Sequence, residues 1–309
     1  MRVIKNIILI ISIASVILFI LNRVYLSGYK KYYRHETERI AVLMDRNFYT
    51  DVIFLGSSRT HVHNNPAVVD SITHLSSYNF GIEGANLLEM KLWLEIYFQK
   101  HTNPKLVLLD LPAFAFDTQR RKFYNPTIYF PYLNNDIIYS TLLKYNRVGL
   151  FRYIPFLEFI EINDYDKSNA VKGLMGQHDQ LSNVYSYRGF VENPIGKVPH
   201  DTTDYKITHE ANNCFKAIIS LCKQKGSRLV VTYSPEYYDT DYRHMQDFFS
   251  LLQYECAKAS IPFWDYRRSP ICRDSTLFAN PGHLKKAGAD VFSAELARDI
   301  LQELGKRPG

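Results

Sequence analysis

The chain has 309 residues, of which 46% are hydrophobic and 22% charged, which is enough apolar sequence for a sizeable core and excludes global disorder. Its 37 basic and 31 acidic side chains give a net charge of +6. Residues 1–40 hold seven basic and two acidic side chains, whereas the rest of the chain holds 30 and 29. Because this body carries no basic excess, we expect no nucleic-acid partner.

The first predicted element is a membrane-spanning helix. Val3 to Leu21 forms a stretch of 19 residues that is apolar except at Lys5, Asn6 and two serines. At a rise of roughly 1.5 Å per residue it spans about 28 Å, close to the thickness of a bilayer's hydrocarbon core. No small-residue cleavage site follows it, so we expect an uncleaved anchor over residues 1–26 in contact with membrane lipid. The alternative is a buried core helix.

The flanking charges and the short N-terminal tail favour opposite orientations of this anchor. Arg2 and Lys5 precede the apolar stretch, and four basic residues follow it: Arg23, Lys30, Lys31 and Arg34. Counted by the positive-inside rule, these charges favour a cytoplasmic body. The short N-terminal tail is typical of a signal anchor, which places the following chain outside. We expect a single-pass protein with an extracytoplasmic, periplasmic body.

The body shows the pattern of an α/β domain. Residues 27–50 are polar and predict a helical stalk, and four short apolar runs then have the form of buried parallel strands: 51–55, 77–81, 106–110 and 228–233. Segments with a helical pattern separate them, such as 87–99 and 214–225. This alternation predicts a three-layer α/β sandwich with a mostly parallel sheet, flavodoxin-like, over residues 51–309. Ligands bind at the carboxyl ends of such strands, where loops begin at Gly56, Gly81, Leu111 and Ser234.

A long interval interrupts the strand pattern at residues 113–205. Eighteen of its 93 residues are Phe or Tyr, or 19% against 14% for the whole chain. The interval is too long for a simple loop, and we interpret it as an inserted, partly helical cap whose aromatic residues form a small core of their own. The alternative is a face on which these rings stack against carbohydrate.

Two short motifs contain residues suited to nucleophilic catalysis. Ser58 follows the first strand in the turn Gly56-Ser57-Ser58-Arg59, where a hydroxyl can be exposed at the sheet edge beside backbone amides. His283 lies near the C-terminus in Asn280-Pro281-Gly282-His283-Leu284, just before the last amphipathic helix. Each motif alone is common in loops that have no catalytic role.

Together these motifs resemble those of the SGNH/GDSL hydrolase superfamily, in its order. Gly56-Ser57-Ser58-Arg59 resembles the Gly-Asp-Ser-Leu block, the segment from Asn79 to Asn86 resembles Asn-x-Gly-x-x-Gly, and the segment around His283 resembles the final block. The resemblance covers roughly residues 50–110 and 225–305. It implies Ser58 as nucleophile, His283 as base, the amides of Ser58 and Gly84 as oxyanion donors, and no cofactor.

The sequence departs from the superfamily pattern at two places. The third block, Gly-x-Asn-Asp, is replaced by Leu111-Pro112-Ala113-Phe114, so the oxyanion Asn is missing. Membrane-anchored relatives of the DltD-like type also depart from this block. Asn280 stands where the superfamily usually has Asp; either it orients His283, or Asp274 or Asp265 takes that role, or the site is inactive.

Four further residues have two interpretations each. Arg59 either binds an anionic substrate group or pairs with an acid, and Tyr233 either lines the substrate pocket or belongs to a Pro-containing turn. His61 and His63 have the spacing of metal ligands, but no acidic motif accompanies them. We therefore expect no metal site, and supporting or surface positions for both histidines.

The four cysteines show no metal-binding pattern. Cys214, Cys222, Cys256 and Cys272 include no CxxC pair and no histidine at zinc-ligand spacing. We expect them to be buried apolar residues, although one or two disulfides stay open for an exported body.

Two functions compete at this stage. The first is a membrane-anchored SGNH-like esterase or O-acyltransferase that acts on acyl esters of a cell-envelope glycan, with partner proteins in the membrane. The second is a catalytically inactive protein of the same fold that binds a glycan or serves as a scaffold in an envelope complex. A distance within about 3.5 Å between Ser58 Oγ and a ring nitrogen of His283 would favour the enzyme.

Overall fold

The computed structural model describes residues 2–119, 122–145, 148–154, 157–158, 164–179, 184–193, 206–238 and 245–305. Contacts divide the chain into two compact units. Unit 1 comprises residues 1–40 and 125–183, and unit 2 comprises residues 41–124 and 184–309. This division differs from the predicted anchor, stalk and capped domain, because residues 125–183, which we expected within the cap, group with the N-terminal helix.

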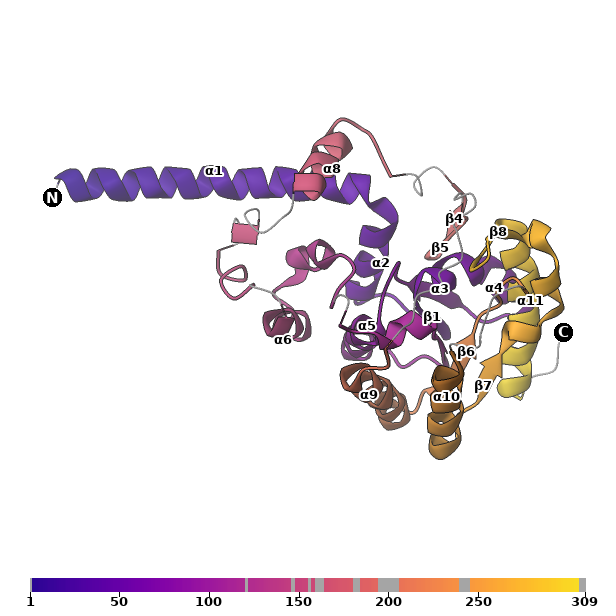
Figure 1. Cartoon of the computed structure of the whole chain (residues 1–309). Helices are drawn as coiled ribbons and strands as arrows, with labels where there is room; N and C mark the ends of the chain where they lie inside the picture. Colours follow the sequence, from indigo (N-terminus) through magenta and orange to yellow (C-terminus); the bar gives the residue numbers. More distant parts are fainter. Residues whose placement is uncertain are drawn as a thin grey trace. The chain divides into compact units, whose positions relative to one another are not determined.

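Unit 2 contains the predicted α/β sandwich (Figure 1). Its five-stranded sheet has the order β2-β1-β3-β6-β7, and every neighbouring pair is parallel. The strands are β1 (Val52–Gly56), β2 (Ser77–Gly81), β3 (Leu106–Asp110), β6 (Arg228–Tyr233) and β7 (Phe263–Asp265). The first four coincide with the apolar runs to within one residue, which confirms the α/β prediction. The short β7 is an additional edge strand.

Helices cover both faces of this sheet. The elements of unit 2 besides the sheet are α3 (Ser58–His63), α4 (Pro66–Thr73), α5 (Leu87–Lys100), η1 (Ala113–Phe116), β4 (Ser186–Tyr187), β5 (Phe190–Val191), α9 (His209–Lys225), α10 (Gln246–Ala259), η6 (Tyr266–Arg268), η7 (Pro270–Arg273), η8 (Ser275–Leu277), β8 (Phe278–Asn280), β9 (His283–Leu284) and α11 (Lys286–Glu303). The helix α2 (Arg34–Met44) crosses the boundary between the units.

Alternation along the strands decides which side chains face which layer. Val52 and Phe54 on β1 and Leu106 and Leu108 on β3 pack in one core with Phe292 and other apolar residues of α4 and α11. Successive side chains of a strand point to opposite faces, so the intervening residues form the core under α5 and α9. Strands buried on both faces explain why their sequences are continuously apolar.

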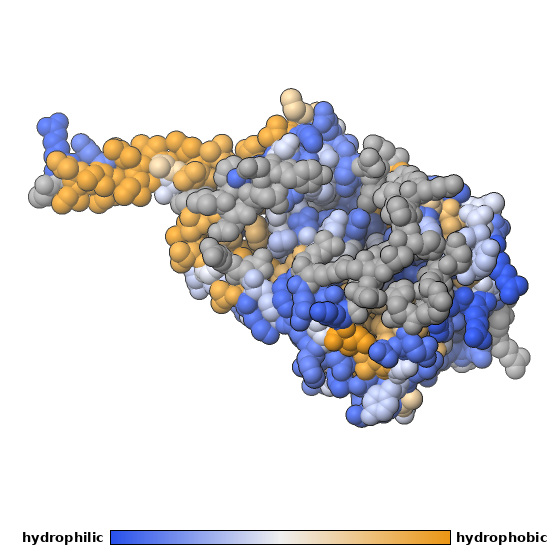
Figure 2. Space-filling model, in the orientation of Figure 1, coloured by the Kyte–Doolittle hydropathy of each residue, from blue (hydrophilic) through white to orange (hydrophobic). Residues whose placement is uncertain are grey.

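Unit 1 is built around the long helix α1 (Arg2–Tyr32), with η2 (Pro126–Tyr132), α6 (Asp136–Tyr145) and α8 (Asp164–Leu174). Among the described residues, α1 is the one helix that is long and apolar enough to cross a membrane, and none of its most apolar window is buried. Figure 2 shows this part of α1 as a predominantly apolar surface. Burial begins at Asn22, within the predicted anchor of residues 1–26, and the helix continues beyond that anchor to Tyr32 and packs against α8.

Glycine allows the close crossing of α1 and α8. A Cβ atom at Gly28 would lie 2.2 Å from the carbonyl oxygen of Ala170, and one at Gly173 would lie 2.0 Å from the carbonyl oxygen of Gly28. Neither position has room for a side chain. Small residues at helix crossings let the backbones approach in this way.

All four cysteines are free and buried, as expected for apolar residues. Burial raises the pKa of the Cys222 thiol to about 12 and that of the Cys272 thiol to about 11. No pair among them forms the disulfide that the sequence left open.

Candidate active site

Ser58 lies where the first strand meets its following helix. The chain leaves β1 at Gly56, passes the buried Ser57, and begins α3 at Ser58. A Cβ atom at Gly56 would lie 2.0 Å from Thr60 Oγ1, so only glycine fits this turn. The turn leaves Ser58 partly exposed at the carboxyl edge of the sheet, between buried neighbours.

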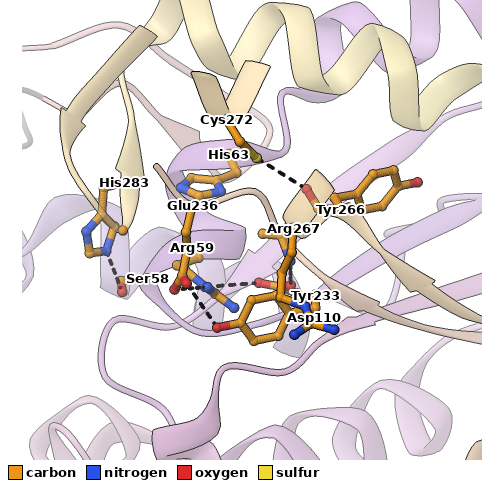
Figure 3. Close-up of polar contacts among 12 residues, drawn as sticks. Ser58, Arg59, His63, Asp110, Tyr233, Glu236, Tyr266, Arg267, Cys272 and His283 are labelled. Carbon is orange, nitrogen blue, oxygen red and sulfur yellow. Dashed lines mark hydrogen bonds and ion pairs between the residues drawn. The ribbon is translucent and has the colours of Figure 1, made fainter. Parts of the chain in front are cut away.

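His283 reaches Ser58 from a hairpin near the other end of the chain. Its Nε2 atom lies 2.9 Å from Ser58 Oγ, although 225 positions separate the two residues in sequence (Figure 3). The hairpin pairs β8 with β9, and Asn280 lies opposite His283 in it. This distance is within the limit of about 3.5 Å that favours an enzyme over an inactive protein of the same fold.

Asn280 fixes the orientation of the imidazole. Asn280 Oδ1 lies 2.9 Å from His283 Nδ1, and it also accepts a 3.1 Å hydrogen bond from the amide of Gly282. The second bond identifies this atom as the carbonyl oxygen, so His283 must donate from Nδ1. Nε2 then carries the free lone pair and accepts from the Ser58 hydroxyl.

The surroundings of His283 favour its neutral form. Burial is the main cause, and the positive charge of Arg59 acts in the same direction; together they lower the pKa of His283 to about 4. A neutral imidazole at neutral pH is the form that can take a proton from Ser58.

The two acids considered as alternatives to Asn280 have other partners. Asp274 caps η8 and accepts bonds from the amide and hydroxyl of Thr276. Asp265 accepts bonds from the guanidinium of Arg267. Asn280 is thus the side chain that the structure places on His283 Nδ1.

Arg59 and Tyr233, for which substrate binding was one of two expectations, are both buried. Arg59 is 3% exposed and Tyr233 is 1% exposed. The guanidinium forms an ion pair with Glu236, lies 3.9 Å from Asp110, and stacks 4.3 Å above the ring of Tyr233 (Figure 3). These contacts favour the alternative in which Arg59 pairs with acids, directly behind Ser58.

The expected oxyanion donors are the backbone amides of Ser58 and Gly84. Gly84 has φ of +62°, a conformation that favours glycine, in the loop after β2. Within the described chain, neither the amide of Gly84 nor that of Ser58 is assigned an acceptor. Asn79 does not replace the missing third-block Asn, because its Nδ2 donates to the carbonyl oxygens of Thr60 and Asn64.

His61 and His63 are both buried, so the surface position is wrong for them. Among the described residues no group of three or more His, Cys, Asp or Glu side chains is arranged to hold a metal ion. His63 instead accepts a 3.1 Å hydrogen bond at Nε2 from the amide of Leu284, and its ring packs edge-on against His283.

The contacts made by two supporting residues could not be predicted from sequence, although a supporting position was one of the two expected for His63. His63 follows Ser58 by five positions on α3, and its contact with Leu284 spans 221 positions. Asn79 was matched to a motif, but its bonds to α3 carbonyls show that it holds the helix that carries Ser58. In the sequence, His63 was marked by its position five residues after Ser58, and Asn79 by its motif.

No protein-family model and no curated protein matches this chain. Among solved structures it is similar to a GDSL-like lipase from Bacteroides thetaiotaomicron, with 11% identity, TM-score 0.42, and coverage of 90% of this chain and 98% of that one. It is also similar to a catalytic mutant of an acetylxylan esterase from Geobacillus stearothermophilus, with 12% identity, TM-score 0.42, and coverage of 84% and 95%. A family two carbohydrate esterase from Clostridium thermocellum shows 11% identity, TM-score 0.42, and coverage of 82% and 64%. At these identities and scores, function must be inferred from the residues of this chain.

Proposed function

We propose that this protein is a membrane-anchored serine esterase or O-acyltransferase of the SGNH type. The observation that carries the proposal is the hydrogen-bonded series Ser58 Oγ, His283 and Asn280, with both bonds at 2.9 Å. A nucleophile, a base in contact with it, and a third group that orients the base form the common arrangement for acyl transfer.

The first half-reaction follows from this geometry. His283 Nε2 takes the proton of Ser58 as Oγ attacks the ester carbonyl, and the amides of Ser58 and Gly84 hold the resulting oxyanion. His283 then gives its proton to the leaving alcohol oxygen, and an acyl-Ser58 ester is left. Water releases the acid in an esterase cycle, whereas a sugar hydroxyl takes the acyl group in a transferase cycle.

Asn280 makes this base weaker than one paired with a carboxylate. An amide oxygen orients the ring but carries no charge to stabilise the imidazolium that forms during attack. The lowered pKa of His283 has the same consequence, because a weaker base receives the serine proton less readily. We therefore expect slow turnover, with labelling by reactive esters and phosphonates as the more sensitive readout.

The anchor and the substrate class belong to the same proposal. We assign α1 to the membrane and the catalytic body to the periplasmic side, where an acylated cell-envelope glycan is within reach of an anchored enzyme. The apolar, exposed surface of residues 2–21 supports the anchor. Partner proteins in the membrane would supply or receive the glycan.

Hydrolysis of p-nitrophenyl acetate by the full chain in detergent tests the chemistry. We expect activity, and covalent labelling by a fluorophosphonate probe, to be lost in Ser58→Ala and in His283→Ala. Ser57→Ala is the matched control, because this neighbouring hydroxyl is buried without a hydrogen-bond partner in the described chain. Labelling that persists in Ser58→Ala would exclude Ser58 as the nucleophile, and a folded but inactive wild type would favour the inactive glycan-binding or scaffold protein.

A further inference from the structure

Unit 1 exposes more apolar surface than the membrane helix alone accounts for. Outside α1, seven large aliphatic side chains are exposed in the described chain, and five of them belong to this unit. The five are Leu143, Leu150, Val171, Leu174 and Met175, and Tyr153 of the same unit is 72% exposed. Scattered exposed apolar residues are ordinary, but their concentration in the unit that contains the membrane helix requires a reason.

Three of these residues form one surface. Tyr139 Oη donates to the carbonyl oxygen of Gly149, and a Cβ atom at Gly149 would lie 3.6 Å from Leu143 Cδ1. The amide of Tyr153 donates to the carbonyl oxygen of Leu150. Leu143, Leu150 and Tyr153 therefore lie together at the end of α6 and in the turn after it, and we call them the α6 surface.

The α6 surface is tied to the point where α1 leaves the predicted bilayer. Asn22 is the first residue after the apolar stretch, and its Nδ2 donates a 3.4 Å hydrogen bond to Glu158. Turn hydrogen bonds link Leu150 to Ile154 and Ile154 to Leu157. The segment that carries the exposed Leu150 and Tyr153 thus reaches α1 at the residue where burial begins.

The composition of this surface suits a lipid headgroup layer. Tyrosine is enriched at membrane interfaces because its ring is apolar and its hydroxyl remains hydrated. Lys144 is exposed beside Leu143, and Arg152 lies between Leu150 and Tyr153, where it pairs with Asp136. Basic side chains close to apolar ones are attracted by anionic headgroups.

We propose that the α6 surface, Leu143, Leu150 and Tyr153, lies in the headgroup layer of the membrane that α1 crosses. This inference rests on the proposed anchor but not on the proposed chemistry. It gives unit 1 a second contact with the membrane, which restricts the rotation of the unit about α1. The partner is the lipid headgroup layer, because the segment that carries the α6 surface contacts α1 at Asn22, where the apolar stretch of the helix ends.

Depth-dependent quenching tests the proposal on the full chain in nanodiscs of phosphatidylcholine with phosphatidylglycerol. Leu150→Cys and Tyr153→Cys carry an environment-sensitive fluorophore, and the wild type, whose cysteines are buried, gives the labelling background. Ser12→Cys in α1 is the control for spanning. Tyr254→Cys, exposed on unit 2, is the matched control for an exposed aromatic position.

We expect lipids with a spin label on the headgroup to quench the Leu150 and Tyr153 positions at least about threefold more than Tyr254, because side chains at this level sit roughly 5–10 Å into the interface. A spin label deep in the acyl chain should quench Ser12 most strongly.

If Ser12 is quenched while Leu150 and Tyr153 behave like Tyr254, the α6 surface does not touch lipid and the proposal is wrong. Shielding of Leu150 from aqueous iodide without lipid quenching would instead indicate a protein partner or a second copy, and would also overturn it. Loss of quenching at Ser12 would show that the anchor itself had failed, whereas the outcome of the esterase assay bears on none of these readings.

Discussion

The backbone amide of Leu284 donates a 3.1 Å hydrogen bond to Nε2 of His63, so that one buried ring joins the helix that begins at Ser58 to the strand that carries His283. Because Nε2 accepts this bond, the ring proton lies on Nδ1. Burial, the neighbouring His283 and Arg59 lower the pKa of His63 well below its usual value, which keeps the acceptor available. His63 is thus a positioning residue for the base.

Replacement of His63 should loosen the contact between Ser58 and His283. In His63→Leu the amide of Leu284 loses its acceptor, and we expect the free energy of unfolding to fall by about 1–3 kcal/mol. We also expect kcat/KM for p-nitrophenyl acetate to fall by about tenfold or more, because the base is no longer held in reach of the nucleophile. His63→Gln, whose side-chain carbonyl can accept the same bond, should recover part of both losses. Equal kcat/KM in the Leu and Gln variants would argue against a positioning role.

The pH dependence of the reaction should report the lowered pKa of His283. The reaction needs neutral His283, so kcat/KM should fall with decreasing pH only below about 4 to 5 and be level from there to neutrality, since the pKa of this residue is about 4. Steady-state rates across this range, with buffers of constant ionic strength, measure the midpoint. A midpoint near 6.5 or above would show that His283 is more solvated than the structure indicates.

The same pKa shift predicts how stability changes with pH. His283 has its ordinary value of 6.5 in the unfolded chain and about 4 in the folded one, so the unfolded state binds more protons between these values. The free energy of unfolding should therefore decrease as the pH falls from 6.5 toward 4. Urea unfolding of the wild type and of His283→Asn isolates this contribution, and the slope should be smaller in the variant. Parallel curves would contradict the prediction.

Restoration of an acid at position 280 should strengthen the base. In Asn280→Asp the carboxylate would accept the same hydrogen bond from Nδ1 and stabilise the imidazolium, raising the pKa of His283 by about 1–3 units. The midpoint of the acid limb in the pH profile of kcat/KM should move to higher pH by that amount. Asn280→Ala removes the orienting group, and we expect a loss of about 10²-fold or more in kcat, given the usual contribution of a positioned base. An unchanged acid limb in Asn280→Asp would mean that Asn280 does not control His283.

Removal of Arg59 should affect both stability and the base. Arg59→Met leaves Glu236 and Asp110 without their buried cation, and loss of one partner of a buried ion pair costs about 3–5 kcal/mol. It also removes the charge that helps lower the pKa of His283, so the acid limb should move to higher pH. Arg59→Lys keeps the charge but loses the planar contact with Tyr233. It should lower the free energy of unfolding without moving the acid limb of the pH profile. A substrate-binding role would instead raise KM with little change in unfolding.

The crossing of α1 and α8 should not accept a side chain at Gly28. A Cβ atom there would approach the carbonyl oxygen of Ala170 to 2.2 Å, so Gly28→Ala forces the helices apart, at a cost of about 1–3 kcal/mol. Limited proteolysis of the full chain in detergent should then cleave near α8 faster. Gly149→Ala is the control, because its nearest neighbour would be at an ordinary 3.6 Å. Equal cleavage of the two variants would show that the crossing tolerates separation.

Local patterns predicted four of the five strands of the parallel sheet, and the resemblance of the motifs to a known superfamily predicted the contact between Ser58 and His283. β2, β3 and β6 begin and end at the residues predicted for them, and in β3 and β6 the reason is that a strand buried on both faces needs a mostly apolar sequence. A serine at the end of such a strand necessarily lies at the carboxyl edge of the sheet. The chain order of the motifs then indicated His283 as its partner.

Long-range contacts decided what the patterns left open. Arg59 follows Ser58 directly, yet the sequence did not show that Glu236 and Asp110 would surround it in the core rather than leave it to a substrate. The grouping of residues 125–183 with α1 depends on backbone approach at Gly28, which no periodicity records. Likewise, the sequence left open whether His63 has a supporting or a surface position, and the fold decides it by bringing Leu284 to His63 across 221 positions. Sequence alone determined which residues were suited to the chemistry, while packing determined which of them remained exposed to perform it.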